Sequence, residues 1–226
     1  MNTIRLMLVL PLVLVAIAAR AGSFEAAVVD GDGAALADAV VWLVPTRAMP
    51  AATGKATSAS MDQRGLQFVP HVLVVQRGSA VSFPNSDQVR HHVYSFSPAR
   101  KFELRLYKSI PAEPVVFDKT GIATLGCNIH DWMLGYVVVV DTPLFAKTDE
   151  TGHLKISDVP AGEYRLELWH PRDLDAGTDR SEMIRIDGPA PTRTFMIRTR
   201  PPSPTTAPTE LEQKFRAYRK TPPGDA

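Results

Sequence analysis

Short apolar runs separated by turn residues dominate the chain between residues 22 and 200. The chain has 19 prolines and 14 glycines, and these fall largely between the runs. Runs of this length, bounded by turn residues, are typical of strands. We therefore predict an all-β fold. The expected strands are Phe24–Asp30, Ala39–Val44, Leu66–Val69, Val72–Gln76, Ala80–Phe83, His92–Phe96, Phe102–Ile110, Val115–Phe117, Ile122–Leu125, Tyr136–Val140, Phe145–Lys147, Leu154–Ile156, Tyr164–Trp169, Met183–Ile186 and Arg193–Ile197.

One of these runs, Tyr136–Val140, is apolar at every position and so on both faces of a strand. Such a run is expected inside a sandwich rather than at its surface. Two segments interrupt the pattern and are expected to be loops. Residues 46–60 are small and polar, and Pro84–Arg90 is a polar stretch between two strands.

The two ends of the chain depart from the strand pattern. Arg5 precedes the apolar run Leu6–Ala18, and Ala19, Arg20 and Ala21 resemble a small-x-small cleavage site. The run is shorter than the roughly 20 residues that span a bilayer comfortably. We therefore predict a signal peptide over residues 1–21 and a mature, periplasmic protein without a membrane span. Residues 201–226 are expected to form a Pro-rich linker followed by a short helical or disordered tail.

Charge and cysteine content narrow the choice of partners. The formal net charge is +1, so no global field favours nucleic acid. The chain has one cysteine, Cys127. In an oxidising compartment thiols are usually paired, so an unpaired one is reactive, intermolecular or bound to a metal.

The strongest chemical signal surrounds that cysteine. Cys127, His130 and Met133 form a Cys-x2-His-x2-Met pattern. Thiolate, imidazole and thioether suit copper better than magnesium or calcium, which prefer oxygen ligands. One thiolate with two imidazoles and a weak axial thioether is the ligand set of a blue-copper electron-transfer site. The pattern therefore predicts one mononuclear copper and requires a second histidine from elsewhere.

That histidine is available upstream, where His91 and His92 follow a polar loop and enter a strand. Because neighbouring side chains on a strand point to opposite faces, only one of the two can readily face the Cys127 loop. We prefer His91 and leave His92 as the alternative.

The segment before the Cys-x2-His-x2-Met loop, together with that loop, resembles a small cupredoxin of the plastocyanin and amicyanin group. The residues that carry the resemblance in this segment are Phe68, Val69, Pro70, Arg77, Gly78, Val81, Phe83, Asn85, Asp87, His91 and Val93. The resemblance covers residues 57–141. It implies a Greek-key β-sandwich and the copper ligands His91, Cys127, His130 and Met133. The chain departs from the group at His92, Leu125 and Asp131. Candidate side chains next to the ligands are His92, Asn85, Asn128 and Trp132.

Residues 22–46 and 142–200 resemble a different family, the carboxypeptidase regulatory-like domain, a small transthyretin-like β-sandwich. The likeness rests on the turn Thr148-Asp149-x2-Gly152 and on the run Val159-Pro160-x-Gly162-x-Tyr164-x-Leu166. The order of segments implies that the cupredoxin is inserted into this second module. Alternatively, Ala39–Val44 belongs to the cupredoxin sheet and the C-terminal strands stand alone.

The sequence thus predicts an exported blue-copper electron carrier rather than an enzyme. Cys127 and His130 lie three positions apart on one tight loop, and no third orienting group for a nucleophile is evident. The expected partners are periplasmic redox proteins, either a dehydrogenase or a cytochrome c. The alternatives are copper binding for storage or delivery without redox turnover, and a β-sandwich that binds no metal.

Overall fold

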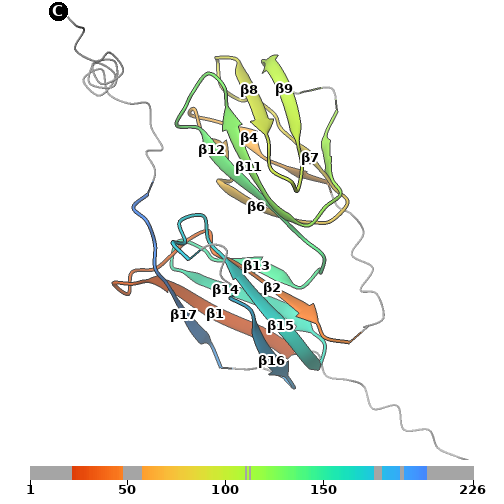
Figure 1. Cartoon of the computed structure of the whole chain (residues 1–226), viewed down its shortest axis with the longest axis vertical. Coiled ribbons are helices and arrows are strands. Elements are labelled where there is room, and N and C mark those ends of the chain that lie inside the picture. The colour runs from red at the N-terminus through yellow and green to blue at the C-terminus, as the bar shows by residue number, and fades with distance from the viewer. Residues whose placement is uncertain are drawn as a thin grey trace, which may run out of the picture.

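The computed structural model describes residues 22–47, 58–109, 111, 113–175, 180–188 and 191–202, and this part of the chain is all-β, without a helix (Figure 1). The all-β prediction is confirmed. Within these residues no helix is long and apolar enough to cross a membrane. The predicted signal peptide over residues 1–21 and the tail from residue 203 onward lie outside the described residues.

The middle of the chain forms a sandwich of two sheets with a small hairpin at its side. One sheet has the order β6-β12-β11-β8-β9, the other has the order β10-β7-β3, and β4 and β5 form the hairpin. The strands are β3 (Ser58–Ser60), β4 (Asp62–Gln63), β5 (Phe68–Val69), β6 (Val72–Gln76), β7 (Ser79–Ser82), β8 (His91–Ser95), β9 (Phe102–Tyr107), β10 (Val115–Phe117), β11 (Gly121–Cys127) and β12 (Leu134–Val140).

Alternating side chains fill the space between these two sheets. Val137 and Val139 of β12 point inward with Leu125 of β11, and they meet Val81 of β7 and Phe117 of β10 in one buried cluster. Because successive strand residues face opposite sides, Val138 and Val140 then point out of this sandwich. They are also buried, so the run from Tyr136 is covered on both faces, as its sequence predicts.

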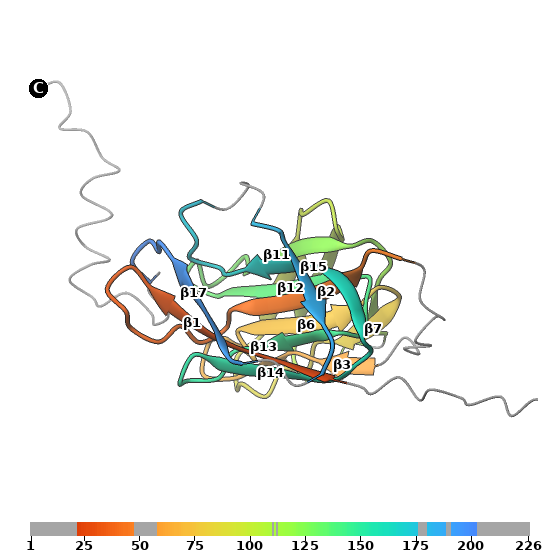
Figure 2. The same cartoon turned by 90° about the horizontal axis from the view of Figure 1, so that it is seen from below.

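The two ends of the described chain form a second pair of sheets. One has the order β14-β1-β17 and the other β13-β2-β15-β16. Figure 2, seen from below, shows these strands in front of β6, β11 and β12. The strands are β1 (Gly22–Asp30), β2 (Val40–Pro45), β13 (Phe145–Lys147), β14 (His153–Val159), β15 (Gly162–Trp169), β16 (Glu182–Ile186) and β17 (Arg193–Ile197).

The chain leaves this second pair of sheets after β2 and re-enters it at β13. These two strands are antiparallel neighbours, with Trp42 opposite Phe145. β2 also pairs with β15, so it has no partner in the β6-β12-β11-β8-β9 sheet. Phe24 of β1 packs with Leu43 of β2 and Tyr164 of β15 in a separate buried core.

The two sandwiches share an apolar contact. Val138 and Val140 on the outer face of β12 lie in one buried cluster with Val40 of β2. The rings of Tyr136 and Trp169 meet edge to face across this contact, with centroids 5.3 Å apart.

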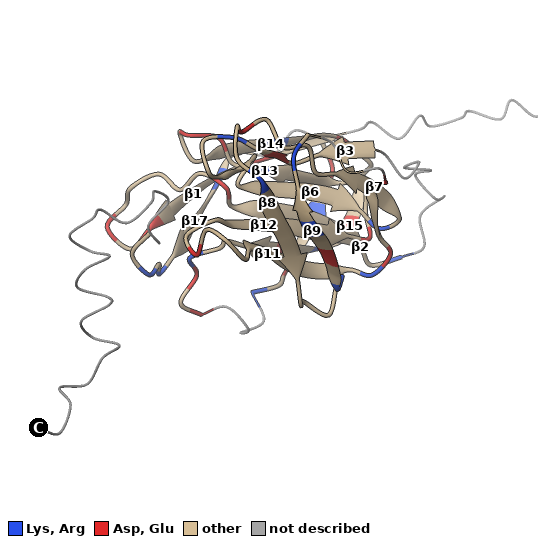
Figure 3. Ribbon diagram, turned by 90° about the horizontal axis from the view of Figure 1, so that it is seen from above, with Lys and Arg blue, Asp and Glu red and all other residues tan. Residues whose placement is uncertain are grey.

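On the face seen in Figure 3, acidic and basic residues are interspersed over the surface rather than separated into patches.

Local differences from the predicted elements concern short strands. The segment predicted as a loop over residues 46–60 contains β3, which pairs in parallel with β7. The predicted strand Leu66–Val69 is reduced to Phe68–Val69, because Gly65 and Leu66 adopt positive φ values of 62° and 59° in the hairpin turn. The strand predicted to begin at His92 begins at His91.

Candidate metal centre

His91 is the first residue of β8, and its ring is fully buried. Inward and outward residues alternate along this strand, so His91, Val93 and Ser95 are buried while His92 and Tyr94 face outward. The pairing of β8 with β9 shifts register between His91 and Val93. The structure therefore shows that the inward face of β8 carries His91, which places this histidine rather than His92 toward the Cys127 loop.

Cys127 ends β11 and is buried, with an exposed fraction of 3%. The loop that follows is held at both ends by backbone hydrogen bonds. The Asn128 N–H donates to the carbonyl of His92 at 3.1 Å, and the Met133 N–H donates to the carbonyl of His130 at 2.9 Å. The loop is therefore tied to β8 on one side and turns tightly before β12 on the other.

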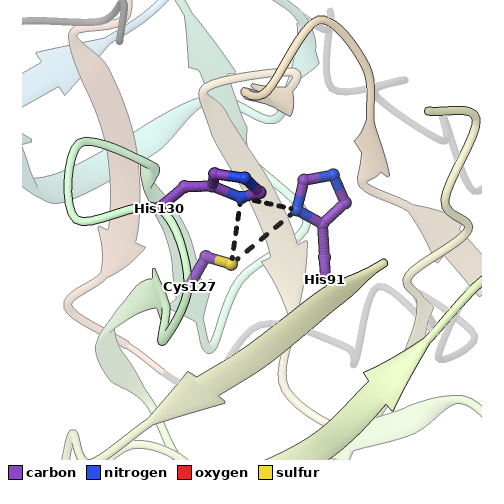
Figure 4. A group of neighbouring side chains, drawn as sticks. All are labelled: His91, Cys127 and His130. Carbon is purple, nitrogen blue, oxygen red and sulfur yellow. Dashed lines mark hydrogen bonds between the residues drawn. The ribbon is translucent and has the colours of Figure 1, made fainter. Parts of the chain in front are cut away.

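These elements bring one sulfur and two nitrogens together (Figure 4). The Cys127 Sγ lies 3.7 Å from His91 Nδ1 and 3.7 Å from His130 Nδ1, and the two Nδ1 atoms are 3.2 Å apart. Among the histidine, cysteine and acidic side chains of the described residues, these three form the group whose donor atoms lie close enough together to hold a metal ion.

The size of this triangle fits a metal ion. A point equidistant from three atoms with these separations lies about 2 Å from each, which is close to the length of metal bonds to imidazole and thiolate. The donor set of one thiolate and two imidazoles favours copper over hard cations. The residues present therefore fit the copper that the sequence predicts.

Met133 lies at the end of the same loop, directly before β12. Its side chain is buried, and it belongs to the same apolar cluster as Cys127. A thioether is a weak copper ligand, and Met133 is the residue that would supply one beside the sulfur and two nitrogens of the triangle.

The other nitrogen of His91 contacts a carboxylate. His91 Nε2 is 2.9 Å from Asp87 Oδ2, and Asp87 also accepts the backbone N–H groups of Gly65 at 2.7 Å and Leu66 at 3.0 Å. Burial acts to raise the pKa of Asp87, but the bonds from Leu66, His91 and Gly65 outweigh it and hold that pKa below its usual value. The carboxylate is therefore ionised at neutral pH.

His130 lies nearer to solvent than His91 and is half-buried. Its ring contacts the Trp132 ring, with centroids 5.3 Å apart. Burial lowers the pKa of His130, the nearby His91 lowers it further, and Asp87 acts in the opposite direction. A neutral imidazole, which this shift favours, is the form that binds a metal.

The four side chains predicted to lie next to the ligands have different positions. Trp132 lies beside His130, with the two rings tilted by 55°. Asn85 shapes the loop before His91, since its Nδ2 donates to the carbonyls of Val89 and Tyr107. His92 faces away from the ligands, with its Nε2 2.8 Å from Glu103 Oε1. Asn128 is exposed.

The contact of Asp87 with His91 was not predicted. Asp87 forms part of the cupredoxin-like pattern, but its spacing of four residues from His91 in an irregular loop does not indicate a contact. The one available signal is an acidic residue close before a ligand histidine, because ligand histidines usually donate their second ring N–H to a carboxylate, a carbonyl or water.

No protein-family model matches the chain, and no curated protein matches it. Solved structures resemble part of it. A purple cupredoxin from Nitrosopumilus maritimus is 22% identical over 36% of this chain and 99% of its own, with a TM-score of 0.33. Amicyanin from Paracoccus versutus is 17% identical over 43% of this chain and 91% of its own, with a TM-score of 0.32.

A copper-containing nitrite reductase from Thermus scotoductus is 23% identical over 42% of this chain and 25% of its own, with a TM-score of 0.35. The structural neighbours are thus cupredoxins. Values this low describe a partial similarity of fold and carry no argument about function, which has to come from the residues of the site.

Proposed function

We propose that the chain is an exported type 1 copper protein that carries single electrons. The observation that carries this proposal is the triangle of Cys127 Sγ, His91 Nδ1 and His130 Nδ1, which has the size and donor set of a copper site. Copper bound there would alternate between Cu(II) and Cu(I), accepting and releasing one electron.

The protein's own part in this function is to hold the ligands still. His91 and Cys127 are buried at the ends of paired strands, and the loop that carries His130 is closed by hydrogen bonds at both ends. Ligands held in this way cannot rearrange freely when the charge of the metal changes, so little reorganisation accompanies each electron transfer.

His130 and Trp132 have a separate task. His130 is the ligand ring that is only half-buried, so it offers the shortest route between the site and a docked partner. The Trp132 ring lies beside this ring, tilted by 55°, and we propose that it shields one side of the ring from water. If Met133 were a fourth ligand beside His91, Cys127 and His130, a bound copper would have no open position for a substrate, which favours a carrier over an enzyme.

The proposed partners are periplasmic redox proteins, a dehydrogenase or a cytochrome c, which suits small and transient docking surfaces. We further propose that the strands outside residues 57–141 form a carboxypeptidase regulatory-like module that supports the copper part. The apolar contact made by Val138, Val140 and Val40 supports this arrangement.

The test is to add Cu(II) to the full chain after removal of the predicted signal peptide and to record its visible and electron paramagnetic resonance spectra. An intense visible band from thiolate-to-copper charge transfer, which gives blue-copper sites their colour, is expected. Cys127→Ser removes the thiolate and should abolish the band. His153→Gln, at an exposed position on β14, is the matched control and should leave it unchanged.

Two outcomes would overturn the proposal. Binding of Cu(I) alone, without colour, would indicate storage or delivery instead of electron transfer. Absence of any copper binding by the folded protein would rule out both of these functions.

A further inference from the structure

The buried ring of His91 is held between the metal triangle and a carboxylate. Its Nδ1 lies 3.7 Å from Cys127 Sγ, and its Nε2 lies 2.9 Å from Asp87 Oδ2. Both oxygens of Asp87 accept backbone N–H groups, so this carboxylate acts as an acceptor and Nε2 as the donor in the contact. This contact therefore selects the tautomer that leaves the Nδ1 lone pair free for a metal.

Asp87 is itself held firmly. Its carboxylate accepts the backbone N–H groups of Gly65 and Leu66, and its own N–H donates to Asn85 Oδ1 at 3.0 Å. Its side chain has an exposed fraction of 13%. The carboxylate thus has little freedom to turn away from His91.

Further backbone bonds fasten the hairpin β4–β5 to the Asp87 loop. The Gln63 N–H donates to the carbonyl of Pro84, and the Ser86 N–H donates to the carbonyl of Gln63, both at 3.0 Å. Asp62 adds a contact, because its Oδ2 accepts the hydroxyl of Ser86 at 2.8 Å. The hairpin and the loop therefore form one rigid support behind the His91 ring.

The second histidine of the triangle lacks such a support. Among the described residues, no carboxylate pairs with the ring of His130, whose neighbour is the Trp132 ring. The two imidazoles are therefore electronically unequal. His91 shares its proton with an anion, which makes its Nδ1 the more strongly donating nitrogen.

Resting on the copper site proposed above, we propose that Asp87 is a positioning residue that fixes His91 and lowers the reduction potential of the site. The charge of Asp87 reaches the metal through the imidazole and stabilises Cu(II), the more highly charged state, more than Cu(I). Interactions of this kind are strong where water is excluded. One electron from a reduced partner converts Cu(II) to Cu(I), while the Nε2 proton stays between His91 and Asp87.

The experiment compares Asp87→Asn with Asp131→Asn. Both variants remove one negative charge near the site, but Asp131 is an exposed residue of the same loop whose side chain makes no hydrogen bond or ion pair with a ligand among the described residues. Midpoint potentials are measured by spectroelectrochemical titration. Asp87→Asn is expected to shift the Cu(II)/Cu(I) equilibrium at least tenfold toward Cu(I), a rise of 59 mV for one electron. Asp131→Asn should shift it less than threefold.

A second readout uses the metal-free protein. Nitrogen-15 NMR of the histidine rings should show His91 protonated at Nε2 in the wild type and a mixture of tautomers in Asp87→Asn. Asp87→Glu, which keeps the charge, should restore part of the low potential. If Asp87→Asn does not fold, the tautomer of His91 in the wild type tests the proposal by itself. A proton on Nδ1 instead of Nε2 would refute the positioning role of Asp87.

The two proposals fail in different ways. A blue protein in which Asp87→Asn and Asp131→Asn have the same potential as the wild type would overturn the role of Asp87 and leave the copper site standing. A wild type that has the expected His91 tautomer but binds no copper would overturn the proposed function and, with it, the effect on potential.

Discussion

Gly135 lies where an added methyl group would strike the support of the metal site. It is buried on β12, and a Cβ atom built there would lie 2.8 Å from Phe68 Cβ and 2.9 Å from Phe68 Cγ. Phe68 belongs to β5, directly after the turn that carries Gly65 and Leu66. Gly135→Ala is therefore expected to lower stability by displacing this hairpin.

The expected loss follows from the packing. Carbon atoms in contact prefer separations of about 3.5 to 4.0 Å, so Phe68 or β12 must move by more than half of an ångström. Phe68 is itself buried in the core, and the clash involves its Cβ rather than a flexible end. Overpacking costs about 1–3 kcal/mol, and the smaller chain entropy of unfolded alanine returns about 0.4–1 kcal/mol. We expect a net loss of about 1–2 kcal/mol.

Urea denaturation of the metal-free protein, followed by tryptophan fluorescence, measures this free energy of unfolding. Gly31→Ala is the matched control, because no atom lies within 4 Å of the position that its Cβ would take. Without a clash, it should be as stable as the wild type or more stable by up to about 1 kcal/mol, from the smaller chain entropy of unfolded alanine. Equal stability of Gly135→Ala and Gly31→Ala would refute this account of the packing.

Three further predictions concern single side chains. His92→Gln should leave the copper spectrum unchanged, because His92 contacts Glu103 on the outer face of β8; a lost band would contradict the ligand assignment. Met133→Leu should change the stability of the metal-free protein by less than about 1.5 kcal/mol and shift the midpoint potential, and an unchanged potential would exclude Met133 as the axial group. Burial lowers the pKa of His170, whose Nε2 donates to the Ala37 carbonyl. As pH falls, the imidazole of His170 is protonated at a higher pH in the unfolded chain than in the folded protein. The free energy of unfolding should therefore fall as pH drops below about 6.5. In denaturation at pH 7.5 and 5.5, this fall should be smaller for His170→Gln, and an equal fall would refute the assignment.

Strands with apolar residues could be predicted from the sequence, including the three-residue strands β10 and β13, whereas β3 and β4, which are small and polar, could not. Tyr136–Val140 is apolar throughout and lies within β12, as expected. β4 covers only Asp62–Gln63, and its residues have no strand character of their own. It forms because Gln63 pairs with Phe68 across a turn in which Gly65 has positive φ. Such a pairing depends on tertiary contacts rather than on local pattern.

The same limit applies to the metal centre. Cys127 and His130 could be predicted together because one loop carries both. The choice of His91 over His92 required knowing which face of β8 is inward, and alternation alone leaves that open. The contact between Asp87 and His91 could not be predicted from local sequence. It depends on the N–H groups of Gly65 and Leu66, which lie in a hairpin more than twenty positions before Asp87.

The pairing of β2 with β13 has a consequence for how the chain reaches its native state. Trp42 and Phe145 are neighbours in one sheet although residues 43–144 separate them along the chain. Closing so long a segment is slow and entropically unfavourable while that segment is unfolded. Once the intervening sandwich has folded, its two ends are brought near each other and the effective loop becomes short. We therefore expect the outer strands to fold after the sandwich that carries the proposed copper site.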